Sequence, residues 1–145
     1  MHEIDELIKD TKDFLVNNFK AGQHHVACGL IADQKKYFSV HLDTYGHDIC
    51  AEPIAVSNAL MEKKRNIELL VCVAWDGNKN HAPHVIAPCG DCRQILIQYA
   101  PDVNVVVQSN EDGNTSIPII DLIPWPYEKM SNYNDISVID SKNDQ

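Results

Sequence analysis

The segment that most constrains the fold is the continuous apolar run from Ile67 to Trp75. Strands that are apolar along most of their length are typical of sheets that are buried on both faces. In layered α/β folds, helices cover such a sheet. A chain of 145 residues is long enough to bury one core of this kind, so we expect an α/β fold.

The segments around this run alternate between helical and strand patterns. Apolar residues three and four positions apart predict amphipathic helices, whereas short apolar runs bounded by polar turns predict strands. The order α-β-β-α-β-α-β indicates a single domain over residues 1–127, followed by a polar tail over residues 128–145. The predicted helices are Ile4–Phe19, Cys50–Lys64 and Cys89–Ala100; the predicted strands are Val26–Ile31, Tyr37–Leu42, Ile67–Trp75 and Val103–Gln108, with loops at Tyr45–Asp48 and Asp76–His84.

The charge of the chain argues against a polymeric nucleic-acid ligand. The formal net charge is −9, from 21 acidic and 12 basic residues. Proteins that bind DNA or RNA neutralise phosphates with clusters of Lys and Arg. The densest basic run here is Lys63-Lys64-Arg65, near a predicted helix end where cations complement the helix dipole. We therefore expect a small-molecule substrate and no nucleic-acid polymer.

Apolar runs and cysteines together indicate the compartment. No apolar run approaches the length that is needed to cross a bilayer. The first six residues, Met1–Glu6, are acidic overall and lack the basic and apolar regions of a secretion signal. We therefore expect a cytoplasmic protein with no membrane contact. The cysteine count of five is odd, and a reducing compartment disfavours disulfides. Cys28 and Cys72 lie in apolar runs and are predicted to be buried core residues; the others need a different explanation.

Two short motifs carry the remaining cysteines, Cys50-Ala51-Glu52 and Pro88-Cys89-Gly90-Asp91-Cys92. Each falls at the predicted start of a helix, where unpaired N–H groups and the helix dipole favour thiolates. Three sulfurs from two helices can hold a metal ion and leave one tetrahedral position open, as catalytic zinc sites require. Zinc lowers the pKa of a water bound there, and Glu52 can take the proton of that water. We therefore predict a Zn²⁺ site held by the three cysteines, with Glu52 as the catalytic residue.

Three thiolates would leave the zinc complex with a formal charge of −1 and weaken the metal as a Lewis acid. Arg93 follows Cys92 directly, so we expect it to donate a hydrogen bond to a zinc-bound sulfur; the alternative is a surface arginine. The alternative to the whole constellation is plain buried thiols or a closed zinc site with a histidine as fourth ligand. Such a histidine would be His41, His47, His81 or His84, although none has the paired spacing of a zinc finger.

These motifs resemble the cytidine deaminase superfamily in its three-cysteine branch, with a closer resemblance to the bacterial blasticidin S deaminases. The resemblance implies a three-layer fold with a mixed five-stranded sheet flanked by helices, and a homotetramer with pockets near subunit contacts. It also implies that zinc-bound hydroxide attacks C4 of a cytosine nucleoside and releases ammonia, while Glu52 protonates N3 and then the leaving amine. The matching stretches are His24-His25-Val26, Ser39-Val40-His41-Leu42-Asp43, Cys50-Ala51-Glu52-Pro53-Ile54-Ala55, Ala87-Pro88-Cys89-Gly90-Asp91-Cys92-Arg93, Tyr99-Ala100-Pro101-Asp102 and Leu122-Ile123-Pro124.

The resemblance further implies contacts with the base. The backbone N–H of Ala51 and the carbonyl near Pro88 would frame it. Tyr127, with Trp125 as its neighbour, would close the pocket, or both would be core aromatics. Apart from the resemblance, His24 and His25 precede a predicted strand near the expected pocket mouth, so one of them would stack on the base or meet an acidic substituent. The alternative is a pair that bonds to backbone at the start of the strand.

Substrate choice depends on two further positions. Ser39 and His41 stand where nucleoside deaminases carry the Asn and Glu that hold the ribose hydroxyls. They can hydrogen-bond a sugar but cannot reproduce that clamp. This favours a modified nucleoside such as blasticidin S over the cytidine or deoxycytidine of pyrimidine salvage. Two other hypotheses are a nucleic-acid-editing deaminase, which needs a basic groove, and a non-catalytic zinc module that binds a partner.

Overall fold

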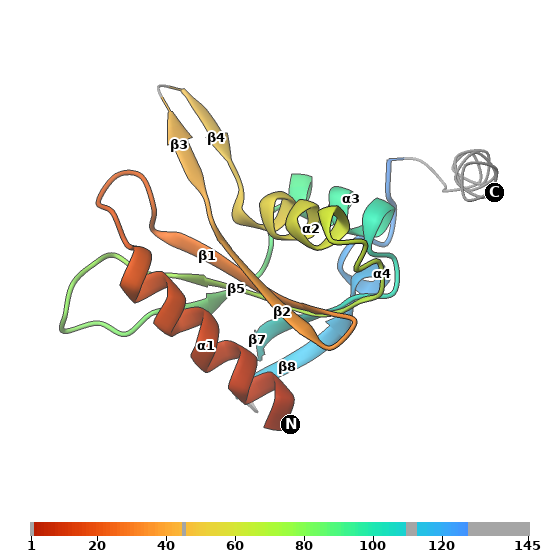
Figure 1. The fold of residues 1–145 in the computed structure, drawn as a ribbon, viewed down its shortest axis with the longest axis horizontal. Coiled ribbons are helices and arrows are strands. Elements are labelled where there is room, and N and C mark those ends of the chain that lie inside the picture. The colour runs from red at the N-terminus through yellow and green to blue at the C-terminus, as the bar shows by residue number, and fades with distance from the viewer. Residues whose placement is uncertain (1, 45, 110–112, 128–145) are drawn as a thin grey trace.

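A computed structural model describes residues 2–44, 46–109 and 113–127 of the chain (Figure 1). The predicted tail, residues 128–145, lies outside the described residues. The helices are α1 (His2–Asn18), α2 (Ala51–Met61), α3 (Gly90–Tyr99) and α4 (Ile119–Leu122). Within the described ranges, no helix combines the length and the hydropathy that crossing a membrane requires. The strands are β1 (Val26–Ala32), β2 (Lys35–Val40), β3 (Leu42–Thr44), β4 (His47–Ile49), β5 (Ile67–Ala74), β6 (His84–Ile86), β7 (Asn104–Ser109) and β8 (Gly113–Pro118).

A mixed sheet forms the middle layer. Its main path has five strands in the order β2-β1-β5-β7-β8, and β6 adds a sixth strand by pairing with β5. The pair β5–β7 is parallel, whereas β1 pairs antiparallel with both β2 and β5. The predicted mixed sheet flanked by helices is therefore confirmed. The central strand β5 is the continuous apolar run, which is buried on both faces as expected.

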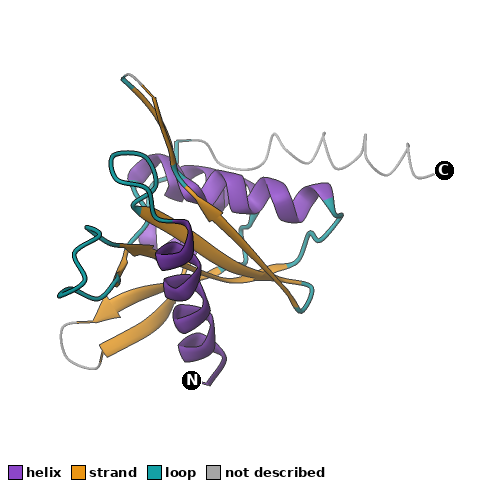
Figure 2. Ribbon diagram, turned by 60° about the vertical axis from the view of Figure 1, so that its left-hand side comes forward, coloured by secondary structure: helices purple, strands orange, loops and turns teal. Residues whose placement is uncertain are grey.

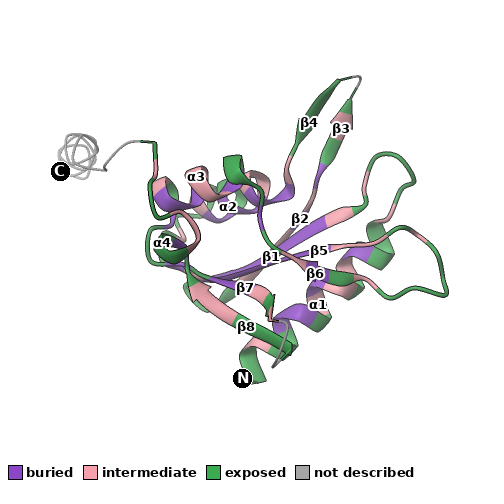
Figure 3. Cartoon of the chain, turned by 180° about the vertical axis from the view of Figure 1, so that it is seen from behind, coloured by how far each residue is buried: buried purple, intermediate pink, exposed green. Residues whose placement is uncertain are grey.

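Helices cover both faces of the sheet, with α1 on one side and α2 on the other (Figures 1 and 2). Successive side chains of a strand point to opposite faces, so each strand of the middle layer serves two cores. Along β1, Ala27 and Ile31 pack in the core under α1, whereas Cys28 and Leu30 pack in the core under α2. Figure 3 shows β1 and β5 buried along most of their length.

The layer under α2 contains the two cysteines that were expected in the core. Cys28 and Cys72 are both fully buried, which confirms that prediction. They are paired across the antiparallel strands β1 and β5, on the face that packs against α2. The buried face of α2 carries the alanines Ala51, Ala55 and Ala59, whose small side chains let the helix lie close to these strands.

The structure departs from the predicted elements mainly in short polar segments. The second predicted strand ends at Val40 rather than Leu42, and β3 and β4 form a separate two-stranded sheet where the loop Tyr45–Asp48 was predicted. The strands β6 and β8 and the helix α4 were not predicted. Each is three to six residues long, and β8 is mostly polar, so neither length nor hydrophobic pattern marks them in the sequence.

Candidate metal centre and active site

The two cysteine motifs lie at the N-termini of neighbouring helices, as predicted. Cys50 is the N-cap residue of α2 and Cys89 is the N-cap residue of α3, and neither thiol caps its own helix. Cys92 lies one turn further along α3 and is buried. Because α2 and α3 pack against each other, sulfurs from two separate segments of the chain meet at one place.

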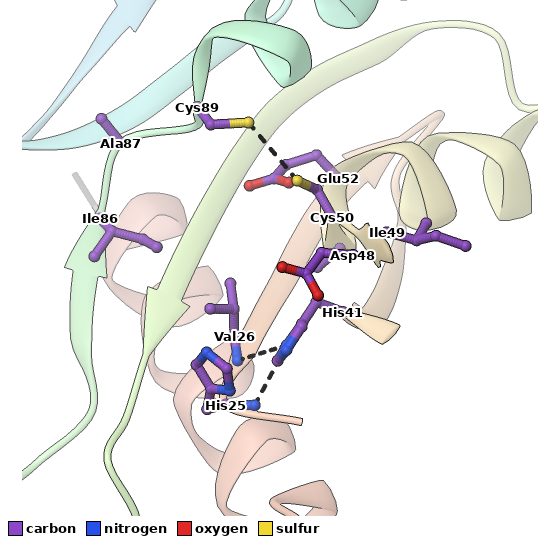
Figure 4. A pocket seen from close by; sticks show the side chains of 11 residues that line it. His25, Val26, His41, Asp48, Ile49, Cys50, Glu52, Ile86, Ala87 and Cys89 are labelled. Atoms are coloured by element: carbon purple, nitrogen blue, oxygen red, sulfur yellow. Dashed lines mark hydrogen bonds between the residues drawn. The ribbon is translucent and has the colours of Figure 1, made fainter. Parts of the chain in front are cut away.

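The sulfur atoms form a group that fits a tetrahedral metal ion. The Sγ atoms of Cys50, Cys89 and Cys92 all lie within 4.8 Å of one another. The Sγ atoms of Cys50 and Cys89 are 3.7 Å apart (Figure 4). Zinc–sulfur bonds of about 2.3 Å in a regular tetrahedron place two sulfurs about 3.8 Å apart. The chain therefore holds a three-cysteine cluster with the donor set and spacing of a metal site.

A closed zinc site would need a histidine as its fourth ligand, and the described part of the chain places none there. No histidine of the described residues belongs to the sulfur group. His81 pairs instead with Asp76 at 2.7 Å, and His47 and His84 are exposed on β4 and β6. A tetrahedral ion held by these three sulfurs would therefore keep one position for a ligand from outside the chain.

Burial opposes the effect of the helix N-termini on the thiols of the sulfur group. Helix N-termini favour thiolates, but burial acts in the opposite direction and raises the pKa of the Cys50 thiol above its usual value. Burial and the neighbouring Glu52 carboxyl raise the pKa of Cys92 as well. The helix ends alone therefore do not ionise these two thiols. A bound cation would, because metal ligation requires the thiolate and releases the proton.

Glu52 lies directly beside the sulfur cluster. It is in the first turn of α2, and its side chain is buried, with 4% of the residue exposed. Its Oε2 is 3.0 Å from the Sγ of Cys92, and its Oε1 is 2.7 Å from the Sγ of Cys72. Glu52 and Cys50 both line the pocket that Figure 4 draws. A buried carboxyl group that adjoins the three-cysteine cluster without joining it is placed to move protons.

A pocket of about 280 Å³ opens onto the cluster and Glu52 (Figure 4). Its volume is near the lower end of the range for small-molecule sites. The walls come from the start of β1, from the segment between β2 and α2, from the first residues of α2, and from β6 with the loop that follows it. The lining residues are His25, Val26, His41, Asp48, Ile49, Cys50, Ala51, Glu52, Ile86, Ala87 and Cys89.

His41 presents a hydrogen-bond donor without a protein partner. Its Nδ1 accepts hydrogen bonds from the backbone N–H groups of His25, at 3.3 Å, and Val26, at 3.2 Å. Nδ1 therefore carries no proton, and in the neutral ring the proton is on Nε2. Nε2 is buried and has no hydrogen-bond partner among the described residues. Burial, followed by the nearby His25 ring, lowers the pKa of His41, so the ring is neutral at pH 7.

Ser39 and Arg93 build the walls of the site through backbone contacts. The Ser39 hydroxyl is buried and donates to the carbonyl of Ala51 at 2.5 Å, which ties β2 to the start of α2. Arg93 donates from Nε to the carbonyl of Pro88 at 2.8 Å and from Nη1 to the carbonyl of Leu122 at 3.1 Å. Among the described residues, Arg93 makes no hydrogen bond to a sulfur, so the expected contact is replaced by one with the loop that carries Cys89.

The other predicted contact residues lie outside the pocket lining of the single chain. His24 Nδ1 is 2.8 Å from the carbonyl oxygen of His41, which matches the backbone-bonded alternative. Trp125 is 91% exposed and Tyr127 is 87% exposed, so neither is a core aromatic. Their role in closing the pocket stays a prediction. His25, which was considered together with His24, does line the pocket, and so does Asp48, which was not predicted and lies two residues before Cys50.

Comparison with known sequences identifies the family. A sequence model of the cytidine and deoxycytidylate deaminase zinc-binding region matches residues 3–109. The chain belongs to this family. The blasticidin-S deaminase of Bacillus cereus is 27% identical to it over 129 residues, which are 86% of this chain and 91% of that protein. The cytidine deaminase of Mycoplasma genitalium is 29% identical over 86 residues, or 58% of each chain.

Solved structures of the family share the fold of this deaminase-family chain. The crystal structure of cytidine deaminase from Bacillus anthracis superposes with a TM-score of 0.72 at 22% identity, covering 92% of this chain and 94% of that one. Cytidine deaminase from Burkholderia pseudomallei gives a TM-score of 0.65 at 24% identity, covering 85% and 98%. The resemblance stated from the sequence is confirmed by the family match and by the cysteine cluster.

Proposed function

We propose that this protein is a zinc-dependent aminohydrolase that removes the exocyclic amine of a cytosine nucleoside. The observation that carries the proposal is Glu52, which is buried, contacts the three-cysteine cluster and lines the pocket. A zinc ion held by Cys50, Cys89 and Cys92 would supply a water of lowered pKa as the nucleophile for C4 of the base. Glu52 accepts a proton from that water and passes it to N3. It then takes the second proton, from the new hydroxyl on C4, and passes it to the exocyclic amine, so that the C4–N bond breaks and ammonia departs.

The start of α2 and the loop before α3 supply groups that orient the base. Ala51 is the first residue of α2, so its backbone N–H has no partner within the helix and can donate to an acceptor on the base. The carbonyl of Pro88 accepts one hydrogen bond from Arg93 and keeps a second lone pair for the exocyclic amine. Arg93 acts in this scheme by fixing the direction of that carbonyl.

His41 binds the substrate through its Nε2–H, which donates to an oxygen of the sugar or base. We expect His41→Asn to raise KM by about 3- to 10-fold with little change in kcat, because the neutral donor is lost from both ground state and transition state. The Asn oxygen can replace Nδ1 as acceptor for the backbone, so thermal stability should change little. His41→Ala loses both functions and should lower the Tm as well. His47→Ala, on the exposed strand β4, is the control and should keep the wild-type KM.

The identity of the nucleoside decides whether the protein acts in pyrimidine salvage or inactivates a modified nucleoside such as blasticidin S. Deaminated cytosine bases absorb differently from their substrates, so ultraviolet assays on cytidine, deoxycytidine and blasticidin S test the reaction and its specificity together. The Ser39 hydroxyl donates its hydrogen bond to the carbonyl of Ala51. It therefore does not take the place of the Asn in an Asn–Glu clamp on the ribose hydroxyls. This supports a modified nucleoside such as blasticidin S, and we expect its kcat/KM to exceed that of cytidine. Absence of turnover on all three compounds would refute the proposed function.

We also propose that the chain assembles as a homotetramer. A mostly apolar groove between α2 and α3 is lined by Pro53, Val56, Ser57, Leu60, Ile95 and Tyr99, and Met61, which follows Leu60 on α2, is 81% exposed. Exposed apolar patches of this kind mark protein interfaces. Sedimentation equilibrium should give four times the chain mass of 16.3 kDa. Met61→Glu should reduce that mass, whereas a charge placed on the opposite layer, at the exposed Val16 of α1, should not.

The proposal also covers the cellular compartment and the class of ligand. None of the five cysteines, which all lie in the described residues, forms a disulfide, and this supports a reducing compartment such as the cytoplasm. The acidic charge of −9 supports a small nucleoside as ligand rather than a nucleic-acid polymer. An editing deaminase would instead bind single-stranded oligonucleotides and slow their migration in a gel-shift assay.

A further inference from the structure

Cys72 belongs to neither the sulfur cluster nor the pocket lining, yet it contacts the proposed proton carrier. Its Sγ lies 2.7 Å from Oε1 of Glu52, in the fully buried layer between β5 and α2. The alternation of side chains along β5 turns Cys72 toward α2, where the first turn of the helix presents Glu52. A hydrophobic residue would suffice to fill a core position. A thiol at hydrogen-bond distance from a buried carboxyl group requires a further explanation.

The direction of this hydrogen bond follows from the chemistry of the two groups. A carboxylate can only accept, and a thiol carries one proton that it can donate. Burial raises the pKa of Cys72 well above its usual value, so the group remains a thiol. Cys72 therefore donates its S–H to Oε1, and this contact adds no charge beside the metal ligands.

The two oxygens of Glu52 thereby become different from each other. Oε1 accepts from Cys72, whereas Oε2 faces the Sγ of Cys92 at 3.0 Å. Oε2 therefore lies on the side of the sulfur cluster, and the hydrogen bond at Oε1 limits rotation of the carboxyl group away from it. Preorganisation of this kind supports rates because a small misplacement of a proton carrier is costly.

We propose that Cys72 is a positioning residue whose thiol holds Oε1 of Glu52, so that Oε2 is presented for proton transfer. This inference rests on the proposed function, because it assigns Glu52 the role of proton carrier. Cys28 offers a matched control. It is also a fully buried cysteine, it lies opposite Cys72 in the β1–β5 register, and it packs in the same layer.

The kinetic test compares Cys72→Ala, Cys72→Ser and Cys28→Ala as zinc-loaded proteins on whichever nucleoside the wild type deaminates. Cys72→Ala should lower kcat on the order of tenfold or more with KM nearly unchanged and zinc content unaltered. The serine hydroxyl can donate to Oε1, so Cys72→Ser should recover most of the lost kcat. Cys28→Ala should keep kcat within about twofold of the wild type, although both alanine variants lose buried volume. Equal kcat values for the two alanine variants, or a Cys72→Ser variant as slow as Cys72→Ala, would overturn the inference.

A spectroscopic test works without turnover and stands if the alanine variant fails to fold. The infrared S–H stretching band of Cys72, assigned by its loss in Cys72→Ser, should lie at a lower frequency than that of a free thiol. Glu52→Gln should move this band upward, because a neutral amide oxygen is a weaker acceptor than a carboxylate. A Cys72 band at the free-thiol frequency in wild-type protein would contradict the contact. An inactive wild type with a lowered Cys72 band would refute the proposed reaction and leave the positioning contact intact.

Discussion

Glu52→Gln should abolish deamination, with a loss in kcat on the order of a thousandfold or more, while zinc content remains that of the wild type. Glutamine has nearly the same shape as glutamate and can still accept the hydrogen bond from Cys72, but it cannot take a proton from water or pass one to the base. The ligands of the metal are untouched, because Glu52 is not a member of the sulfur group. Turnover assays combined with metal analysis of the same sample measure both quantities.

The matched control for this variant is Glu62→Gln. Glu62 follows the last residue of the same helix, where it is exposed and bonds to Lys35 and Tyr37 rather than facing the pocket. This control should retain wild-type kcat, since the loss of a surface ion pair costs little. A non-catalytic zinc module would tolerate Glu52→Gln as well as Glu62→Gln, and equal activity of the two variants would favour that reading.

The second large effect is expected for Cys92→Ala, which should lose both bound zinc and activity. Cys92 is the most buried of the three cysteines in the cluster, so its removal leaves two sulfurs that are more open to water. Two ligands cannot hold a catalytic zinc ion against dialysis with a chelator. The zinc-dependent rise in Tm that a bound ligand produces should disappear together with the metal.

Cys28→Ala is the control for the loss of a buried cysteine. It removes a buried thiol from the core under α2 that is not a member of the three-cysteine cluster. It should lower the Tm but keep the wild-type zinc content. A Cys92→Ala variant that retains zinc through dialysis would show that this residue is not a ligand.

The sequence indicates the metal centre well because its parts are local. Cys89 and Cys92 are held together by one turn of α3, and Glu52 follows Cys50 within the first turn of α2. The remaining requirement is that the two helices begin side by side. The layered α/β order, with a central strand apolar on both faces, favours that arrangement. The main helices and strands were predicted for the same reason, since their periodicity is strong.

Contacts that depend on several long-range placements could not be predicted in the same way. Arg93 adjoins Cys92 in sequence, but its side chain runs to the carbonyls of Pro88 and Leu122, and adjacency does not specify that direction. The short hairpin β3–β4, which carries Asp48 to the pocket, has too few residues to show a period. Cys72 looks like an ordinary core residue within its apolar run. Only the packing of β5 under α2 reveals its contact with Glu52.

X-ray absorption at the zinc edge of the wild-type protein tests the metal centre most directly. An open catalytic site predicts three sulfur ligands at about 2.3 Å and one lighter ligand at about 2.0 Å that is replaced when a nucleoside analogue binds. A zinc ion surrounded entirely by protein sulfur and nitrogen, unchanged by the analogue, would contradict an open position beside Glu52.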